Sequence, residues 1–244
     1  MRLLFAILIL NLFMHTAYAE KRDISITTLD FSPYISETLP NNGWAWEVAY
    51  EALLSQGYRA HLEILPWARA VKMVEIGRYD ALYMANYNEE RNSWAIFSDP
   101  VGQEITVPFK LKARNLEITN IQEMRNLRVS SLRGAHVTNK VAEMGVITDP
   151  TTDIKSGITR VYQGRSDLFI ADKFVTMHLI KTEMPSNYYD SIEPLDFAVD
   201  SNHLHLAFSR KIPDHMELVS AFNKGLTHLR ETGLYDAILK KHGF

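Results

Sequence analysis

A short pattern occurs twice in this sequence and limits the folds that the chain can adopt. It consists of Gly, Arg, any residue and Asp followed by an apolar run, first at 77–84 and again at 164–171. In both places an apolar stripe at helical spacing precedes the glycine, which favours a helix, a left-handed glycine at its C-terminus and a short buried strand. Two copies of this unit predict two similar α/β lobes.

Each unit is followed by a charged residue. Arg91 follows the first strand and Asp172 follows the second. In open α/β sheets, ligands bind beyond the carboxyl ends of the strands, so we expect a cation and an anion to face one cleft. Taken singly, Arg91 suits a surface residue paired with Glu89 or Asp99, and Asp172 suits a helix N-cap. Their equivalent positions after the two repeated strands favour ligand binding.

The first 19 residues have the pattern of a secretory signal. Arg2 is followed by an apolar run at 3–14 and by Ala17-Tyr18-Ala19, which predicts cleavage before Glu20. The apolar run is well short of the ~20 residues that span a bilayer. We therefore expect a periplasmic protein that is not embedded in the membrane.

Charge and cysteine content exclude several classes of function. Removal of the signal takes away Arg2 and leaves 25 of the 26 Lys and Arg against 29 Asp and Glu, a net charge of −4. This balance argues against nucleic acid or anionic lipid as partners. The chain has no cysteine, which excludes a disulfide scaffold, a thiol nucleophile and a lipid-modified cysteine anchor. We expect a monomer without cofactor.

The remaining pattern predicts β-α-β units in both lobes. A long strand at 105–113 leaves the first lobe, and a strand at 204–209 returns antiparallel to 107–111, so the lobes are connected by two crossings. The predicted organisation is a signal peptide at 1–19, lobe 1 at 20–109 and 205–244, and lobe 2 at 110–204.

The order of these motifs resembles one known family. The chain has the two repeated units, Arg91 followed by Phe97-Ser98-Asp99-Pro100, and a closing Gly-Leu-Tyr-Asp-Ala-Ile-Leu-Lys-Lys-His-Gly-Phe at 233–244. In these features it resembles the extracellular solute-binding proteins of family 3, the periplasmic amino-acid-binding components of ABC transporters, over 23–244. The resemblance implies a two-lobed periplasmic-binding-protein fold with a two-crossing hinge, each lobe a central sheet flanked by helices.

The resemblance also implies roles for individual residues. In that family an Arg before a Phe-Ser-x-Pro segment binds the ligand α-carboxylate, which corresponds to Arg91. An Asp five residues beyond the Asp of the second unit binds the α-amino group, which corresponds to Asp172. The family's aromatic wall corresponds to Phe31 and Trp67, which would enclose the ligand from two sides.

Further family positions are changed in this sequence. Asn86 stands where the family usually has Ser or Thr, with Met84 beside it on the strand. The backbone N–H groups of Ala135 and His136 stand where a Gly-Thr-Thr turn opens a helix, and they would bind the carboxylate at that helix start. The resemblance thus implies a ligand-binding role for all four residues.

Two other patterns in the sequence bear on metal binding and catalysis. His203 and His205 share one face of a strand, but no nearby Cys or carboxylate completes a metal-ligand set. Adjacent Glu89 and Glu90 point about 100° apart on a helix and cannot flank one glycosidic bond. We expect no catalytic activity and delivery of a small zwitterion to an ABC permease. The alternatives are a sensor module for a membrane signalling protein and an enzyme of the dehydratase or transglycosylase type.

Overall fold

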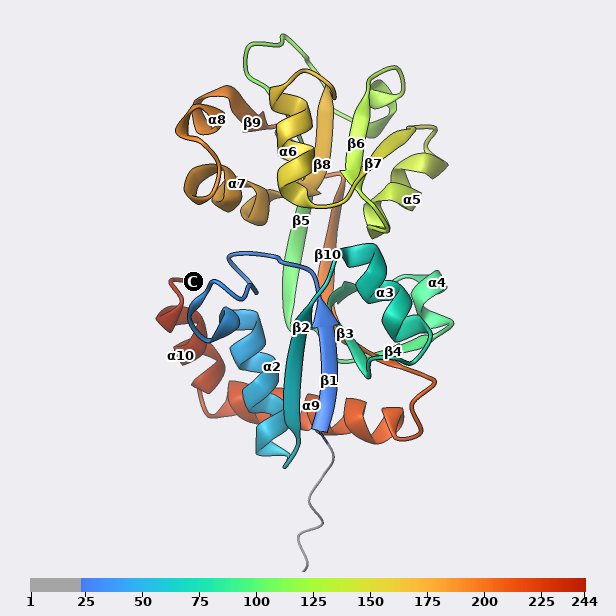
Figure 1. Cartoon of the computed structure of the whole chain (residues 1–244), viewed down its shortest axis with the longest axis vertical. Coiled ribbons are helices and arrows are strands. Elements are labelled where there is room, and N and C mark those ends of the chain that lie inside the picture. The colour runs from blue at the N-terminus through green and yellow to red at the C-terminus, as the bar shows by residue number, and fades with distance from the viewer. Residues whose placement is uncertain (1–22) are drawn as a thin grey trace, which may run out of the picture.

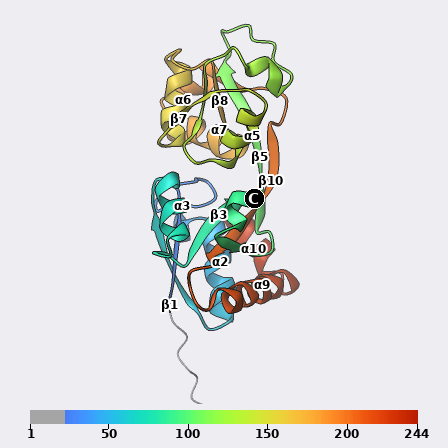
Figure 2. The ribbon, with the colours of Figure 1, turned by 90° about the vertical axis from the view of Figure 1, so that its right-hand side faces the viewer.

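The computed structural model describes residues 23–244; the predicted signal peptide at 1–19 lies outside them. Figures 1 and 2 show two bodies stacked along the long axis and joined by two long strands, β5 (Gly102–Leu111) and β10 (Asp200–Ser209). We call the body with the first strand and the C-terminus lobe 1, and the other body lobe 2. The predicted two-lobed α/β fold is confirmed. No helix in the described part of the chain is long and apolar enough to cross a membrane.

One sheet runs through both lobes. Its strand order is β2-β1-β3-β10-β5-β8-β6-β7, with β4 on β10 and β9 on β5. The other strands are β1 (Asp23–Thr28), β2 (Arg59–Ile64), β3 (Ala81–Asn86), β4 (Ala95–Phe97), β6 (Val129–Leu132), β7 (Thr148–Thr151), β8 (Leu168–Asp172) and β9 (Ile192–Pro194).

Lobe 1 is built on the parallel strands β2, β1 and β3. Two of its helices pack closely at Gly225, where a Cβ would lie 2.0 Å from the carbonyl oxygen of Ala52, so only glycine permits this approach. The helices of lobe 1 are η1 (Pro40–Asn42), α2 (Trp44–Ser55), α3 (Trp67–Glu75), α4 (Glu89–Asn92), α9 (His215–Glu231) and α10 (Leu234–Lys241).

Lobe 2 is built in the same way on the parallel strands β8, β6 and β7. Here a helix approaches the sheet at Gly157, where a Cβ would lie 2.2 Å from the ring of Phe169. The helices of lobe 2 are η2 (Ile121–Met124), α5 (His136–Glu143), α6 (Ile154–Tyr162), α7 (Lys173–Thr182) and α8 (Ser186–Ser191).

The crossing strands pair in a register that differs from the predicted one. β10 runs antiparallel to β5, but it pairs from Asp200 opposite Thr106 to Leu204 opposite Gly102. The segment 107–111, predicted to pair with β10, instead pairs with β8 and β9. The prediction was wrong because the polar residues 200–203 show no alternation of apolar and polar residues. This pattern gave no indication of the part of β10 that pairs with β5.

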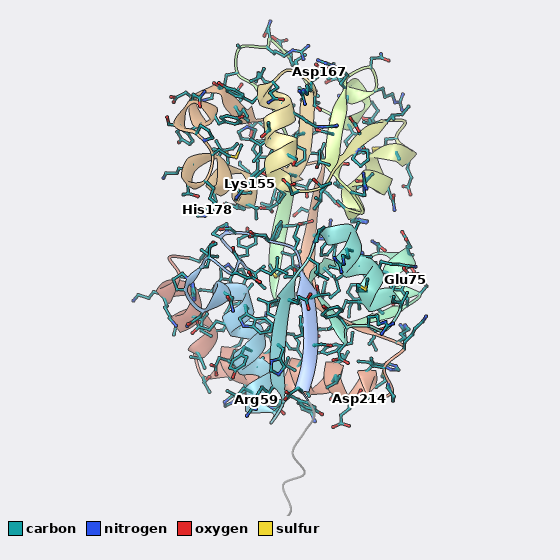
Figure 3. The ribbon with its side chains drawn as sticks, viewed as in Figure 1. Arg59, Glu75, Lys155, Asp167, His178 and Asp214 are labelled. Carbon is teal, nitrogen blue, oxygen red and sulfur yellow. The ribbon has the colours of Figure 1, made fainter. Side chains whose placement is uncertain are left out.

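The aspartate of each repeated unit fixes the start of a strand. In lobe 1 the carboxylate of Asp80 accepts hydrogen bonds from the backbone N–H and the hydroxyl of Ser25, both at 2.7 Å. In lobe 2 the carboxylate of Asp167 accepts from the backbone N–H of Arg128 at 2.8 Å and forms ion pairs with the Arg128 and Arg114 side chains. Figure 3 shows Asp167 at the end of lobe 2 that is remote from lobe 1, so its role is structural.

Candidate functional site

A small cavity of about 60 Å³ lies where the two lobes meet at β5. It has room for only about four water-sized groups, so the lobes are close together around it. Most of its wall is apolar, and its polar groups come from both lobes and from β5. The lining residues are Leu29, Phe31, Trp67, Met84, Asn86, Glu104, Thr106, Leu132, Ala135, His136, Val137, Ile154, Ile170, Ala171 and Asp172.

Seven of the residues singled out in the sequence lie around this one cavity. Phe31, Trp67, Met84 and Asn86 reach it from lobe 1, and Ala135, His136 and Asp172 reach it from lobe 2. They are distant in the sequence, and the strand ends of the two lobes bring them together. The eighth residue, Arg91, does not line the cavity.

Asp172 supplies a buried carboxylate at the start of α7. Its Oδ1 accepts a hydrogen bond from the backbone N–H of Val175 at 2.8 Å, so it is the N-cap of that helix. Its Oδ2 accepts from the backbone N–H of Ile105 on β5 at 3.2 Å. Burial raises the pKa of Asp172 to about 6. Asp172 is therefore both the N-cap of α7 and a residue that lines the cavity.

Arg91 is buried behind the cavity wall. Its Nη1 donates to the carbonyl of Asn86 at 3.0 Å, its Nη2 donates to the carbonyl of Gly134 at 3.1 Å, and its guanidinium lies 5.2 Å from the centre of the Trp67 ring. It faces a second hollow of about 200 Å³ next to the cavity. In this conformation Arg91 and Asp172 therefore do not line the same cavity, because the Arg91 guanidinium donates to the carbonyls of Asn86 and Gly134.

The carbonyl of Gly134 connects the two lobes. It accepts one hydrogen bond from Arg91 and a second from Nε1 of Trp67 at 3.0 Å, both of which belong to lobe 1. Gly134 has a φ of +76°, and a Cβ at this position would lie 3.5 Å from Ala68. A left-handed glycine thus exposes a lobe 2 carbonyl to two donors of the other lobe.

The start of α5 is arranged differently from the expected carboxylate site. The backbone N–H of Ala135 donates to the carbonyl of Leu132 at 3.0 Å, so it is already used within lobe 2. The expectation that this N–H binds a carboxylate is wrong because Leu132 and Ala135 close a turn around Gly134. His136 begins the helix and lies 3.5 Å from the Asp200 carboxylate, and burial lowers its pKa.

Glu104 is a cavity residue that the sequence analysis missed. It lies on β5, and its Oε1 accepts a hydrogen bond from Nδ2 of Asn86 at 2.7 Å. Burial, reinforced by the negative charge of Asp172, raises the pKa of Glu104 to about 7. Glu104 was missed because the predicted strand began one residue later, at Ile105. Its position, an acidic residue directly before an apolar crossing strand, was the sequence feature that could have indicated a role in the site.

Met84 has a strained backbone inside β3. Its φ is +55°, in the left-handed region that non-glycine residues seldom adopt. Met84 lines the cavity in the lobe 1 part of the wall. Such outliers concentrate at binding sites, where the surrounding structure holds them in place.

The two histidines on β10 do not form a metal site. The rings of His203 and His205 are 6.5 Å apart, and Nδ1 of His205 is hydrogen-bonded to the carbonyl of Ser98 at 2.8 Å. Within residues 23–244, no three side chains of His, Asp or Glu are grouped so that they could hold a metal ion.

The sequence profile of the bacterial extracellular solute-binding proteins, family 3, matches residues 25–244. The chain belongs to this family. The match covers both lobes and both crossing strands, so the family assignment applies to the whole described fold. A search of curated proteins found no match.

Many solved structures share the fold of this family member. A histidine kinase sensor domain with similarity to periplasmic binding proteins is 20% identical, with a TM-score of 0.81, and the match covers 92% of this chain and 97% of that one. An ancestral arginine-binding protein bound to arginine is 18% identical, with a TM-score of 0.76 and coverage of 92% and 100%. An ancestral amino-acid-binding protein, described as a precursor of cyclohexadienyl dehydratase, is 18% identical, with a TM-score of 0.73 and coverage of 90% and 94%.

Proposed function

We propose that the protein binds a small zwitterionic solute, an amino acid, between its lobes in the periplasm and delivers it to an ABC permease. The observation that carries this proposal is the position of Asp172, a buried carboxylate at a helix start that opens into a cavity lined by both lobes. A buried carboxylate is costly unless a cation pairs with it, and a ligand ammonium group supplies that cation. Membership of family 3 supports the binding role.

We also propose that Arg91 binds the ligand carboxylate. Arg91 donates to the backbone carbonyl of Asn86 and lies over the Trp67 ring, and both residues line the cavity, so Arg91 lies directly behind the cavity wall. A small movement of the lobes would let Nη2 exchange the Gly134 carbonyl for a carboxylate oxygen. The exchange is favourable because hydrogen bonds between two charged groups are about twice as strong as neutral ones. Phe31 and Trp67 would form the aromatic walls.

The proposal extends to the organisation of the chain. We place the lobe boundaries after residues 109 and 204, within the crossing strands, so that lobe rotation about β5 and β10 opens and closes the site. The protein would act as a monomer, released from its signal peptide after residue 19.

Thermal unfolding with each L-amino acid tests the proposed function. A ligand that binds only the folded form adds ~2.7 kcal/mol of stability at a hundredfold excess over Kd, which raises Tm by several degrees for a chain of this size. We expect at least one amino acid to produce this shift. A full set of amino acids without any shift would contradict the proposal.

Two substitutions test the proposed anchors. Asp172→Asn keeps the cap bond from Val175 but removes the charge, and Arg91→Gln removes the cation. Since breaking a buried ion pair from one side costs ~3–5 kcal/mol, each should weaken binding about 10²–10⁴-fold. Arg59→Gln is the matched control, because Arg59 is exposed at the end of lobe 1 remote from lobe 2 (Figure 3). Retention of the full shift by both variants would show that the anchors are misassigned.

Two alternatives remain testable. A membrane signalling protein would replace the permease as the recipient, an alternative favoured by the structural likeness to a histidine kinase sensor domain. An enzyme is favoured by Glu104, whose pKa of about 7 suits a group that donates and accepts protons at neutral pH. Incubation with a prephenate-like acid and with peptidoglycan, followed by product analysis, separates the enzyme from both binding roles, because only the enzyme forms product.

A further inference from the structure

We propose that Glu104 is a specificity-determining residue: together with Asp172 it forms a two-carboxylate site that selects small amine ligands with a net positive charge. This inference rests on the proposed function, binding in the interlobe cavity, and adds the charge class of the ligand. Basic amino acids and small diamines share this chemistry, and their relative affinities distinguish them.

Strand pairing brings the two carboxylates to one place. Glu104 and Thr106 are two residues apart on β5 and therefore share one face of the strand. Thr106 pairs directly with Asp172 on β8, and the backbone N–H of Ile105 donates to the Asp172 carboxylate. Glu104, Thr106 and Asp172 all line the cavity. A ligand ammonium group in the cavity therefore has one carboxylate from β5 and one from the end of β8 within reach.

The charges around the cavity leave an excess of one negative charge. Asp200, which also acts on Glu104, is neutralised by an ion pair with Lys140. The cation of Arg91 offsets one of the two carboxylates of Glu104 and Asp172. A zwitterion brings no net charge into this site, whereas a ligand with one extra positive charge neutralises it. Buried charge without a partner is strongly unfavourable, so the cationic ligand is preferred.

An adjoining hollow provides room for a second amino group. It has a volume of about 270 Å³, and Asp30 and Asp153 are among its lining residues. Lys155 forms an ion pair with Glu183 at 2.5 Å, and the charges of Asp30 and Asp153 also act on it. An aliphatic chain can run from the two-carboxylate site along apolar walls toward these two aspartates. The walls shared by the cavity and the hollow are Leu29, Trp67, Leu132 and Ile154.

The pKa shifts in the cavity agree with this assignment. Burial raises the pKa of Glu104 to about 7 and that of Asp172 to about 6, so both groups are ionised at pH 8 and largely protonated at pH 5. A bound cation stabilises the ionised forms, so affinity for a cation should fall as the pH decreases through this window.

Other titratable groups near the cavity either lower the affinity for a cation as the pH decreases, as the two carboxylates do, or leave it unchanged. Burial raises the pKa of Tyr34, which stays neutral. Burial lowers the pKa of His136, which becomes positive only in acid and then repels a cation as well. Arg91 stays charged, since burial lowers its pKa only to about 10. The effect of Glu104 must therefore be isolated by substitution and not by pH alone.

Calorimetric titration with three related probes tests the proposal. L-lysine carries the extra charge, L-norleucine lacks the side-chain ammonium, and cadaverine lacks the α-carboxylate; L-ornithine, L-norvaline and putrescine repeat the series with a shorter chain. At pH 8 the wild-type protein should bind the cationic amino acid at least tenfold more tightly than its neutral counterpart. Cadaverine or putrescine binding equal to that of the amino acid would identify a diamine ligand.

Substitution of Glu104 provides the decisive comparison. Glu104→Gln keeps the acceptor for Asn86 and should remove the preference by weakening L-lysine binding at least tenfold, while Glu104→Asp should retain part of it. Glu117→Gln is the matched control: Glu117 is exposed and close in sequence to Arg114, which pairs with Asp167 at the remote end of lobe 2. Unchanged Tm values of the free variants would show that they fold.

The outcomes separate this inference from the proposed function. If the wild-type protein binds L-norleucine as tightly as L-lysine and Glu104→Gln changes neither, the charge selection is wrong while amino-acid binding stands. If no cationic probe and no amino acid binds, both proposals are overturned. If Glu104→Gln removes the preference and Glu117→Gln does not, the assignment of Glu104 is correct.

Discussion

The repeated units of lobe 1 and lobe 2 start alike and end differently. Each has a left-handed glycine, with φ of +77° at Gly77 and +66° at Gly164, followed by an aspartate that accepts a backbone N–H of the neighbouring strand. Beyond the strand, lobe 2 presents Asp172 directly to the cavity, whereas lobe 1 inserts a turn that buries Arg91 behind it. The repeat therefore specifies the backbone, and the loop after each strand decides what reaches the ligand.

Helix packing shows a second difference between the lobes. In lobe 1, Gly225 on α9 lies against the backbone carbonyl of Ala52, which cannot move without moving α2. In lobe 2, Gly157 on α6 lies against the side chain of Phe169, which can reorient. A glycine thus permits a close contact in both lobes, but the contact is with a fixed backbone carbonyl in lobe 1 and with a side chain that can shift in lobe 2.

The largest expected effect concerns these two glycines. Gly225→Ala should destabilise the protein by about 3 kcal/mol or more, since overpacking against backbone exceeds the ~1 kcal/mol that alanine gains over glycine in a helix. Gly157→Ala should cost less, about 1–2 kcal/mol, because Phe169 can shift. Urea unfolding followed by circular dichroism measures both. Equal losses would contradict the difference between the lobes.

The next effect concerns the two aspartates. Asp167→Asn removes the charge that pairs with Arg114 and Arg128, and it should destabilise lobe 2 by about 1–2 kcal/mol. The loss is smaller than for a fully buried pair because these arginines are 39% and 59% exposed and are screened by solvent. Hydrogen exchange of β6 and β8 measures the local loss of stability, which should decrease in high salt.

Asp80→Asn is the counterpart in lobe 1. Its carboxylate binds the hydroxyl and N–H of Ser25, and an amide oxygen can still accept one of these bonds. We expect the free energy of unfolding to fall, because the variant keeps at most one of the two hydrogen bonds with Ser25, each worth ~0.5–1.5 kcal/mol. Urea unfolding measures the loss, and an unchanged free energy of unfolding would contradict the structural role of Asp80.

The smallest expected effect concerns the contact between the lobes. Trp67→Phe removes the bond to the Gly134 carbonyl but keeps the ring, so ligand affinity should fall by about tenfold at most, as for one net hydrogen bond of 0.5–1.5 kcal/mol. Trp44→Phe is the control, because Nε1 of Trp44 has no hydrogen-bond partner among the described residues. Titration of both variants with an amino acid found in the thermal screen measures the difference, and equal losses would dismiss the Gly134 contact.

Local features of this fold could be predicted because the residues that determine them are adjacent in sequence. Asn88 caps α4 and Asn120 caps η2, each by accepting a backbone N–H three residues ahead, which is the usual role of Asn directly before a helix. The repeated strands 81–84 and 168–171 also form as predicted, since their continuous apolar runs have no alternative to burial.

Features that depend on the relation between the lobes could not be predicted in this way. The direction of the Arg91 guanidinium depends on the Gly134 carbonyl, 43 residues away in the other lobe. Glu104 becomes a cavity residue only because β5 pairs with β8 in a particular register. The periodicity and turn residues of a single sequence predict helices, strands and turns. They do not predict which face of a crossing strand contacts the other lobe.

The two donors on the Gly134 carbonyl have a consequence for the equilibrium between open and closed forms. Trp67 and Arg91 belong to one lobe and Gly134 to the other, so these hydrogen bonds favour the closed population in the ligand-free protein. A ligand's apparent Kd is its intrinsic Kd divided by the fraction of molecules that is already competent to bind. If the ligand enters the open form, a more stable contact between the lobes slows ligand entry. If the closed form retains the ligand, the same increase in stability prolongs the residence time of the ligand. The strength of the hydrogen bonds on the Gly134 carbonyl would thus set how long a captured molecule stays.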